Sequence, residues 1–513
     1  MRKEQKTNIK NSIGRAIVAA LSLALQIIWI VQLFTKLNQY STGINMFTVL
    51  IALFLVVWIY GKNQNAAFKM MWIILLLAAP VLGVCMYVLI GHDKGTKKMR
   101  ARFKKIDGEL FSKLEQAPGV METLEDRDYG IANQFRYIHD YGYYPVYQNA
   151  DVEFYSEAAE AFEAQLCDLK RAENFIFLEY HAIEEAQSFS RMKEILAERA
   201  AHGVEVRILY DDAGSVGFID PKFVKRMEEI GVTCRVFNPV MPFLNLFMNN
   251  RDHRKITVID GKVAYTGGYN LADEYFNITH PYGKWKDTGI RLAGEAVKSF
   301  TIMFLEMWNA VEETDTEFEK YLPHINYRAK EQGFIQPFAD MPLDEEYMGE
   351  NVYMNMIKNA KHTLYVATPY LIISDEMNRE LTLAAQRGVD VRMITPGIPD
   401  KKVIYKVTRS NYNALVDRGV RIYEYTPGFI HEKQVLADGE LAAVGTINFD
   451  YRSLYHHFEN GVLIYGYNVV KEIGKDFEET FDVSNEVTEH YRNQKNVAVR
   501  FAQGLMQILS PLL

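Results

Sequence analysis

The stretch that decides the fold is present twice in this chain: residues 253–270 read HRKITVIDGKVAYTGGYN, and residues 431–448 read HEKQVLADGELAAVGTIN. Both copies fit the pattern H-x-K-x4-D-G-x5-G-x2-N without a gap, and the second lies 178 residues after the first. A single H-x-K would carry no information, because so short a pattern arises by chance. Two copies with every spacing kept indicate an internal duplication.

The spacing within each copy has a structural interpretation. The apolar, β-branched run after His253 predicts a strand, in which alternate side chains share one face, so His253 and Lys255 project together. Asp260-Gly261 is typical of a type I′ hairpin turn, and the returning strand brings Asn270 back beside the histidine and the lysine. The corresponding residues of the second copy are His431, Lys433, Asp438, Gly439 and Asn448.

This set of side chains suits the chemistry of a phosphoryl group. Lysine supplies positive charge, asparagine and a glycine-rich backbone supply hydrogen-bond donors, and histidine acts as nucleophile or proton carrier. The predicted catalytic residues are His253, Lys255, His431 and Lys433, and the predicted phosphate-binding residues are Gly267, Asn270, Gly445, Thr446 and Asn448. Hairpin geometry alone accounts for Asp260 and Asp438, for which we favour a structural role.

At these residues the chain resembles the phospholipase D superfamily, whose signature is a paired HKD motif. The resemblance covers roughly residues 130–513. It implies an α/β fold of two duplicated halves packed about a pseudo-twofold axis, with one active site built from both motifs. It also keeps Asp260 and Asp438 among the candidate catalytic residues, because both belong to the family's motif.

A second repeat supports the duplication independently of the motif. AAHGVEVRILYDD at 200–212 matches AAQRGVDVRMITPG at 384–397, and in each case a helix is followed by an apolar strand. Such strand–helix–strand units predict an α/β sheet in each half. The predicted domains are a membrane region over 1–92, a charged connector over 93–135, a first catalytic half over 136–311, a linker over 312–350, and a second catalytic half with an apolar C-terminal segment over 351–513.

Aligning the two halves beyond the motif identifies two further carboxylates. Residues 284–290 match residues 456–462, and each stretch opens an alternating strand that carries one acidic side chain, Asp287 or Glu459. We predict that these carboxylates accept a hydrogen bond from the motif imidazoles, which would fix the tautomer and stabilise the imidazolium. The alternative is an ordinary charge at the end of a strand.

Three apolar runs near the N-terminus, over 16–34, 46–60 and 72–90, each approach the ~20 residues that a membrane-spanning helix needs. They predict two to three transmembrane helices and a multi-pass protein of the bacterial cytoplasmic membrane. A cleaved signal peptide is the alternative for the first run, and soluble core helices are the alternative for the other two. Lysine and arginine are balanced between the two sides, so the positive-inside rule gives no orientation.

Composition sets further bounds on the function. The chain has 513 residues, of which 49% are hydrophobic, so it can bury at least two cores. Its three cysteines, Cys85, Cys167 and Cys234, lie too far apart for a disulfide framework or a zinc site. A net charge of −8 argues against a partner such as nucleic acid, which basic proteins grip by overall charge.

Within the superfamily, the chain looks like the bacterial cardiolipin synthases. Residues 448–453, NFDYRS, resemble the N-x-D-x-R-S that follows the second motif in those enzymes, and TPY at 368–370 and DDAGS at 211–215 are similar as well. Two positions depart from the family pattern. Gly268 stands where many members carry Ser, and His457 stands where Asn is expected.

The resemblance implies a phosphatidyl transfer that needs no metal and no cofactor. One histidine, for which we favour His253 over His431, attacks the phosphorus of phosphatidylglycerol while the other protonates the departing glycerol. A second phosphatidylglycerol then takes the phosphatidyl group, which gives cardiolipin. The implied partners are phosphatidylglycerol and other anionic membrane lipids, and the oligomeric state stays open.

Three alternatives share some of these features. A membrane-bound phospholipase D would use the same residues with water as the acceptor. A membrane-tethered nuclease of the same fold would need a basic groove, whereas this chain is acidic beyond its first hundred residues. A non-catalytic membrane scaffold would have no reason to keep two intact motifs.

Overall fold

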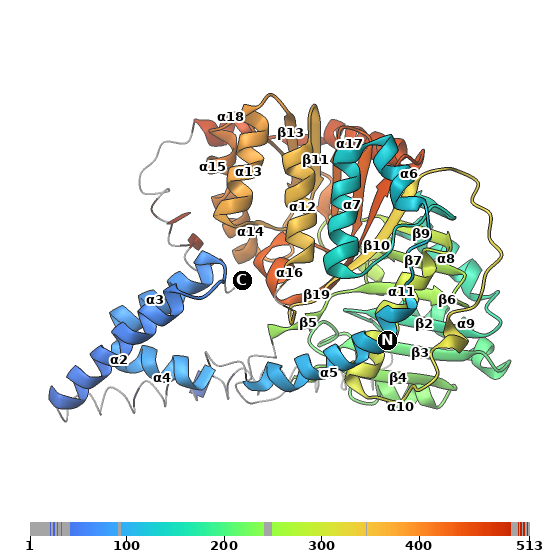
Figure 1. The fold of residues 1–513 in the computed structure, drawn as a ribbon, viewed down its shortest axis with the longest axis horizontal. Helices are drawn as coiled ribbons and strands as arrows, with labels where there is room; N and C mark the ends of the chain where they lie inside the picture. The colour runs from blue at the N-terminus through green and yellow to red at the C-terminus, as the bar shows by residue number, and fades with distance from the viewer. Residues whose placement is uncertain are drawn as a thin grey trace.

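The computed structural model describes residues 42–90, 94–240, 249–344 and 346–493, together with isolated positions between 21 and 32 and between 501 and 510. Two α/β halves pack against each other, and a group of N-terminal helices extends from this body to one side (Figure 1). The α/β fold with duplicated halves that the sequence predicts is thereby confirmed.

The first half is built on a seven-stranded sheet with the order β1-β9-β7-β6-β2-β3-β4. Its strands are β1 (Ala150–Tyr155), β2 (Phe175–Tyr180), β3 (Glu205–Asp211), β4 (Val232–Phe237), β6 (Lys255–Ile259), β7 (Val263–Gly267) and β9 (Gly289–Gly294), and its helices are α8 (Ala158–Leu169), α9 (Gln187–Ala201), α10 (Phe223–Glu228) and α11 (Val297–Val311). Strand β2 is buried along its whole length, as expected for a central strand with both faces covered.

The second half repeats this order with one strand added, as β10-β19-β17-β16-β11-β13-β14-β20. Its strands are β10 (Phe334–Asp340), β11 (Thr363–Ala367), β13 (Asp390–Pro396), β14 (Arg421–Tyr425), β16 (Gln434–Ala437), β17 (Leu441–Gly445), β19 (His457–Tyr465) and β20 (Ser484–Glu486), and its helices are α12 (Met348–Asn359), α13 (Asp375–Gln386), α14 (Lys402–Ser410), α15 (Tyr412–Val416), α16 (Tyr451–Tyr455), α17 (Val469–Asp482) and α18 (Thr488–Arg492). The duplication read in the motifs is therefore a duplication of the whole sheet.

Two short strands cross between the halves. Strand β5 (Arg251–Asp252) of the first half pairs in parallel with β19 of the second half, and β15 (Gly428–Ile430) of the second half pairs in parallel with β8 (Lys284–Lys286) of the first. Each crossing strand lies directly before a motif histidine. The exchange therefore carries each histidine to the edge of the other half.

The predicted boundaries of the connector and the linker differ from the structure. Helix α7 (Tyr129–Gly142), at the end of the connector, packs on α12 and β10 of the second half, because Phe135 and Ile138 give it an apolar face. The predicted linker contains β10, the first strand of the second sheet. Its Pro337 is tolerated because β10 is an edge strand, where a missing N–H breaks no ladder.

The N-terminal helices are α2 (Thr42–Tyr60), α3 (Ala66–Ala78), α4 (Pro80–Ile90) and the basic α5 (Lys94–Leu110). The apolar run 46–60 lies in α2, whereas the run 72–90 is not one helix. It breaks at Ala79, whose backbone leaves the helical region (φ −143°, ψ 73°) as a residue before proline tends to do. Beyond Pro80 the chain folds back, so closely that a Cβ on Gly83 would lie 2.7 Å from the Cα of Leu76.

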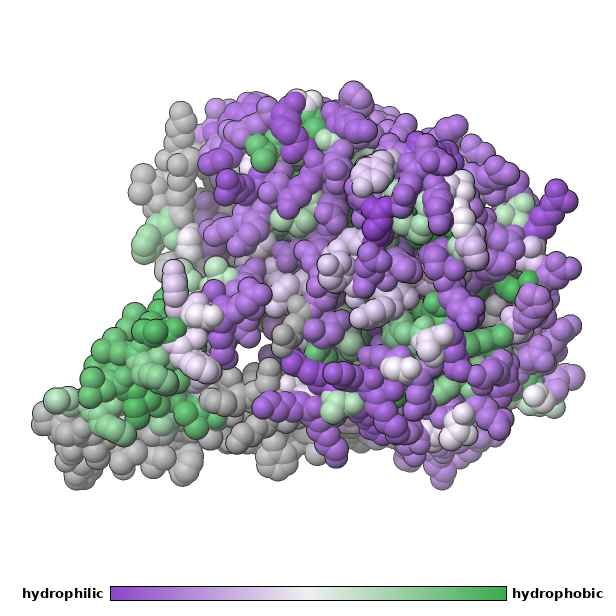
Figure 2. Space-filling model, viewed as in Figure 1, coloured by the Kyte–Doolittle hydropathy of each residue, from purple (hydrophilic) through white to green (hydrophobic). Residues whose placement is uncertain are grey.

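Apolar side chains are exposed on α2, α3 and α4. Figure 2 shows them as a hydrophobic region that projects from a largely hydrophilic body. On α2 the exposed side chains include Phe54, Val57 and Trp58. Among the described residues, we find no helix that combines the length and the apolar character needed to cross a membrane. The predicted span over 16–34 and most of the apolar C-terminal segment lie outside the described residues.

Candidate active site

The motif hairpins have the turn that their sequence predicts. Asp260 and Gly261 both have positive φ, 53° and 63°, and join β6 to β7 as a type I′ turn does. The Asp260 carboxylate accepts hydrogen bonds from the backbone N–H groups of Glu173, Asn174 and Phe175 at 2.7–2.9 Å. It therefore holds the start of β2 and does not face the imidazoles.

Asp438 does the same in the second half. Its φ is 55°, and its carboxylate accepts from the backbone N–H groups of Lys361, His362 and Thr363 at the start of β11. The shared geometry places both motif aspartates at the far end of their hairpins from the histidines. Neither lies among the groups that could contact a substrate phosphate.

The motif histidines meet carboxylates from the opposite half. Nδ1 of His253 lies 2.9 Å from both carboxylate oxygens of Glu459, and Nδ1 of His431 lies 2.7 Å from Oδ2 of Asp287. The crossing strands create this arrangement. The backbone N–H of His253 donates to the carbonyl of Phe458, at 2.9 Å, beside Glu459. With Nδ1 held by a carboxylate, Nε2 of each ring is left to react.

The two motif lysines lie beside the histidines, as the strand alternation predicts. Lys255 Nζ donates to the carbonyl of His253 at 2.6 Å. Lys433 Nζ donates to the carbonyl of His431 and also lies 2.9 Å from its Nδ1. Burial lowers the pKa of Lys255 to about 8 and that of Lys433 to about 7, although the neighbouring carboxylates oppose the shift.

Burial and the two lysines also lower the pKa of both motif histidines well below its ordinary value. Both imidazoles are therefore neutral at pH 7 before substrate binds, which is the state that a nucleophile needs. Burial raises the pKa of Asp287 to about 7, with Lys433 as the main opposing charge. An incoming phosphate would add a negative charge at the centre of this cluster and favour protonation of one histidine.

The two motif asparagines are both buried but are not bonded alike. Asn270 Oδ1 accepts from the backbone N–H of Ala182 at 3.2 Å, and its Nδ2 donates to the hydroxyl of Tyr275 at 2.9 Å. Asn448 Oδ1 has no hydrogen-bond partner among the residues that the structure describes. The carbonyl oxygen of Asn448 can thus accept a hydrogen bond from a ligand, such as one from a lipid hydroxyl.

The glycines predicted to bind phosphate are required by packing. A Cβ on Gly267 would lie 2.3 Å from the carbonyl oxygen of Thr288, and a Cβ on Gly445 would lie 2.3 Å from that of Asn460. Thr446 was also predicted to bind phosphate, but its hydroxyl donates to Glu459 Oε2 at 2.5 Å. Its side chain supports the carboxylate that holds a histidine.

Close packing explains why position 268, the counterpart of Thr446, departs from the family pattern and is a glycine. A Cβ at this position would lie 2.0 Å from Asp287 Oδ1 and 2.8 Å from the carbonyl oxygen of His431. Any larger side chain would displace the carboxylate that holds His431. In place of a threonine hydroxyl, Asp287 accepts from the backbone N–H of Thr288 at 2.9 Å.

The surroundings of the two histidines differ, and sequence reasoning missed part of this difference. His253 lies between two further imidazoles, with ring centroids 5.0 Å away at His181 and 5.3 Å away at His457. His431 lies against aromatic rings instead, with Trp285 at 5.2 Å and Tyr275 at 5.3 Å. His457 was visible in the sequence as a departure from the family, whereas no pattern pointed to His181.

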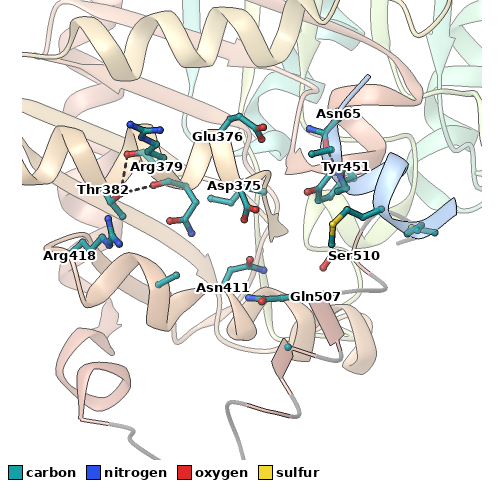
Figure 3. Close-up of a pocket in the computed structure, with 18 of the residues that line it drawn as sticks. Asn65, Asp375, Glu376, Arg379, Thr382, Asn411, Arg418, Tyr451, Gln507 and Ser510 are labelled. Carbon is teal, nitrogen blue, oxygen red and sulfur yellow. Dashed lines mark hydrogen bonds between the residues drawn. The ribbon is translucent and has the colours of Figure 1, made fainter. Parts of the chain in front are cut away.

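A cavity of about 750 Å³ lies elsewhere, between α3 and the second half (Figure 3). Its lining combines apolar side chains of α3, such as Met70 and Ile74, with charged side chains such as Asp375 and Arg379 of α13. None of the paired histidines, lysines or their carboxylates line it. We therefore place the chemistry at the crossed histidines and not in this cavity.

Comparison with known proteins agrees with this geometry. A family model described as "Cardiolipin synthase, PLD-like domain" matches residues 166–308 and 353–481, and a phospholipase D-nuclease N-terminal model matches residues 49–92. A cardiolipin synthase of Geobacillus kaustophilus is 31% identical over 498 residues, which cover 96% of this chain and 99% of that protein. An uncharacterized protein of Streptococcus mutans is 39% identical over 458 residues, covering 89% of this chain and 99% of its own length.

A solved structure shares the fold. The phosphatidylserine synthase of Haemophilus influenzae superposes with a TM-score of 0.55 at 13% identity, over 74% of this chain and 99% of that one. At this identity the likeness shows the arrangement of the two halves only.

Proposed function

Because this chain belongs to the cardiolipin synthase family of the phospholipase D superfamily, we propose that its crossed histidines transfer a phosphatidyl group between two phosphatidylglycerol molecules. The chain is a phosphatidyltransferase. The observation that carries the proposal is the crossed pairing of His253 with Glu459 and of His431 with Asp287. It gives one site two neutral imidazoles, each with its Nδ1 fixed and its Nε2 available.

In the first step, Nε2 of His253 attacks the phosphorus of one phosphatidylglycerol and the bond to the glycerol oxygen breaks. His431, protonated once the anionic phosphate has bound, gives its proton to the departing glycerol. The environment of His253 favours the role of nucleophile. Glu459 holds His253 with both oxygens and is itself held by Thr446, which stabilises a ring that becomes cationic on bonding to phosphorus.

The environment of His431 favours the role of proton donor. The ammonium of Lys433 lies 2.9 Å from its Nδ1, and so close a positive charge makes the imidazolium more acidic. Lys255 and Lys433 also supply charge to the phosphorane, and the NH₂ group of Asn448 donates a further hydrogen bond to it. In the second step, the primary hydroxyl of another phosphatidylglycerol gives its proton to His431 and displaces His253, which yields cardiolipin.

The N-terminal helices support a lipid substrate. They expose apolar side chains, and we propose that they hold the enzyme in the membrane as a multi-pass protein. A second cavity, of about 610 Å³, lies between these helices and the catalytic body. Its lining includes Lys62 and Trp72 on the helix side and Asn250, directly before β5, on the catalytic side. A headgroup could pass from the membrane region to the histidines along this cavity.

The test is to incubate the purified full chain with phosphatidylglycerol alone and to identify the products. We expect cardiolipin and free glycerol in equal amounts. Phosphatidic acid with glycerol would mean that water is the acceptor, and the protein would then be a hydrolysing phospholipase D. If a properly folded enzyme forms neither cardiolipin nor phosphatidic acid, phosphatidylglycerol is rejected as the substrate.

A further inference from the structure

His457 is the one departure from the family pattern that the proposed chemistry does not use. It occupies the position equivalent to Trp285 of the other half, at the start of β19, with its side chain about nine-tenths buried. Its Nδ1 is buried and has no hydrogen-bond partner among the described residues, although it lies 3.4 Å from Glu459 Oε1. An imidazole nitrogen is thus aimed at the carboxylate that holds His253.

These three residues form a compact set of metal ligands. One ligand atom from each of His253, His457 and Glu459 lies within 4.8 Å of the other two, and no other such group of three or more occurs among the described residues. At Zn–N and Zn–O distances of about 2.0–2.2 Å, neighbouring ligands of a tetrahedral zinc ion lie roughly 3.3 Å apart. The Glu459 oxygens lie 2.9 Å from His253 Nδ1 and 3.4 Å from His457 Nδ1.

From this geometry we propose that His253, His457 and Glu459 bind a Zn²⁺ ion that inhibits the enzyme. Two histidines and one glutamate are a common zinc set, and they leave a fourth position for water. The inhibitory part of this inference rests on the proposed function, whereas the binding part does not.

Inhibition follows from the tautomer of His253. In the free enzyme its Nδ1 carries the proton that Glu459 accepts, and its Nε2 has the lone pair that attacks phosphorus. A zinc ion on Nδ1 takes the place of that proton, which moves to Nε2, so the nucleophile loses its lone pair. In the free enzyme, Nε2 of His457 accepts a hydrogen bond from the exposed side chain of Arg452 at 3.3 Å. Zinc on Nδ1 of His457 moves the ring proton to Nε2, so the side chain of Arg452 has to turn away. No net proton is released.

The experiment measures zinc binding and zinc inhibition on the same full-chain protein. We compare the parent enzyme with His457→Asn, which restores the family's residue. The control is His456→Asn, because the neighbouring His456 packs against Phe68 outside the cluster. Zinc binding is titrated by calorimetry without lipid, and turnover is measured with ZnCl₂ alone and after EDTA.

We expect the parent and His456→Asn to bind one equivalent of Zn²⁺ tightly and to lose turnover reversibly. Loss of even an outer partner of a metal ligand costs ~10–100-fold in affinity, so His457→Asn should bind zinc about 100-fold or more weakly. Its turnover should tolerate a correspondingly higher zinc concentration. If His457→Asn fails to fold, His457→Gln replaces it.

The outcomes separate the two proposals. The zinc inference is overturned if the parent and His457→Asn bind zinc equally, or if zinc neither binds nor inhibits the parent. In either case, a parent enzyme that still turns over lipid leaves the proposed function intact. Binding that depends on His457 in a protein without transferase activity keeps the zinc site and rejects the function.

Discussion

Glu459→Gln is the substitution that tests the crossed site most sharply. It removes the charge that holds Nδ1 of His253 but keeps the size of a side chain that is completely buried. The amide oxygen can still accept from Thr446, whose hydroxyl bonds Oε2 at 2.5 Å. The fold around β19 should therefore persist, and only the charge on the partner of the histidine should change.

The magnitude follows from the bond that is lost. A hydrogen bond to a charged group contributes about 1.5–3 kcal/mol, and a site as buried as this one lies at the upper end. Since 1.4 kcal/mol is a factor of ten, 3 kcal/mol corresponds to a fall of about 150-fold in kcat. The amide can also offer its NH₂ to Nδ1 and stabilise the wrong tautomer, an effect that reaches ~10⁴-fold in serine protease triads. We expect a fall in kcat of between about 100-fold and 10⁴-fold with KM almost unchanged.

The assay is the initial rate of cardiolipin formation from phosphatidylglycerol at several lipid concentrations. Asp168→Asn serves as the matched control, because it removes another buried carboxylate, one that binds Tyr265 and Arg291 away from the histidines. Thermal unfolding of both variants shows whether each is folded at the assay temperature. A folded Glu459→Gln enzyme that keeps more than a fifth of the parent kcat would refute the role of Glu459 across the interface.

Three further predictions follow from the same site. The pKa of Lys433 is lowered to about 7, so its ammonium loses a proton as the pH rises through that value, and kcat/KM should fall on the alkaline side from about pH 7. Lys433→Arg, whose guanidinium stays charged, should move this fall up to about pH 8, where Lys255 loses its proton; an unchanged pH profile would contradict the role of Lys433. Asp260→Ala leaves three backbone N–H groups of the β2 start without their acceptor, so urea unfolding should show a loss of about 3 kcal/mol while the kcat of the folded fraction stays unchanged; a catalytic defect without a loss of stability would contradict the structural role. Exhaustive EDTA treatment should leave the activity in place, because lysine and asparagine meet the phosphate charge; complete loss restored by one divalent ion would reveal a required metal.

Much of the site could be predicted because it repeats. The constant spacing of the two motifs fixed which residues share a strand face, and the Asp-Gly turns have the positive φ that the dipeptide favours. Aligning the halves also identified Asp287 and Glu459. What the alignment could not give is the crossing: strands β5 and β15 are two and three residues long, and nothing in so short a segment specifies a partner from the other half.

The predictions that differed did so where tertiary packing overrides local pattern. Thr446 lies in the phosphate-binding part of the motif, yet its hydroxyl serves Glu459, a contact that exists only once β17 and β19 pair. The run 72–90 is uniformly apolar, and its break at Pro80 is a backbone effect that hydropathy does not report. His181 is brought beside His253 by the pairing of β2 with β6, although 72 residues separate them in sequence.

The most direct test of the account is to locate the covalent intermediate. The His431→Ala and His253→Ala variants are each treated with a phosphatidyl substrate that has a good leaving group and a label in the phosphatidyl moiety, and the labelled peptide is identified. Without its proton donor the enzyme should still form the phosphatidyl-histidine slowly and then hold it, so we predict label on His253 in His431→Ala and no label in His253→Ala. Label on His431 in His253→Ala would reverse the two roles, and label in neither variant would contradict a two-step transfer through histidine.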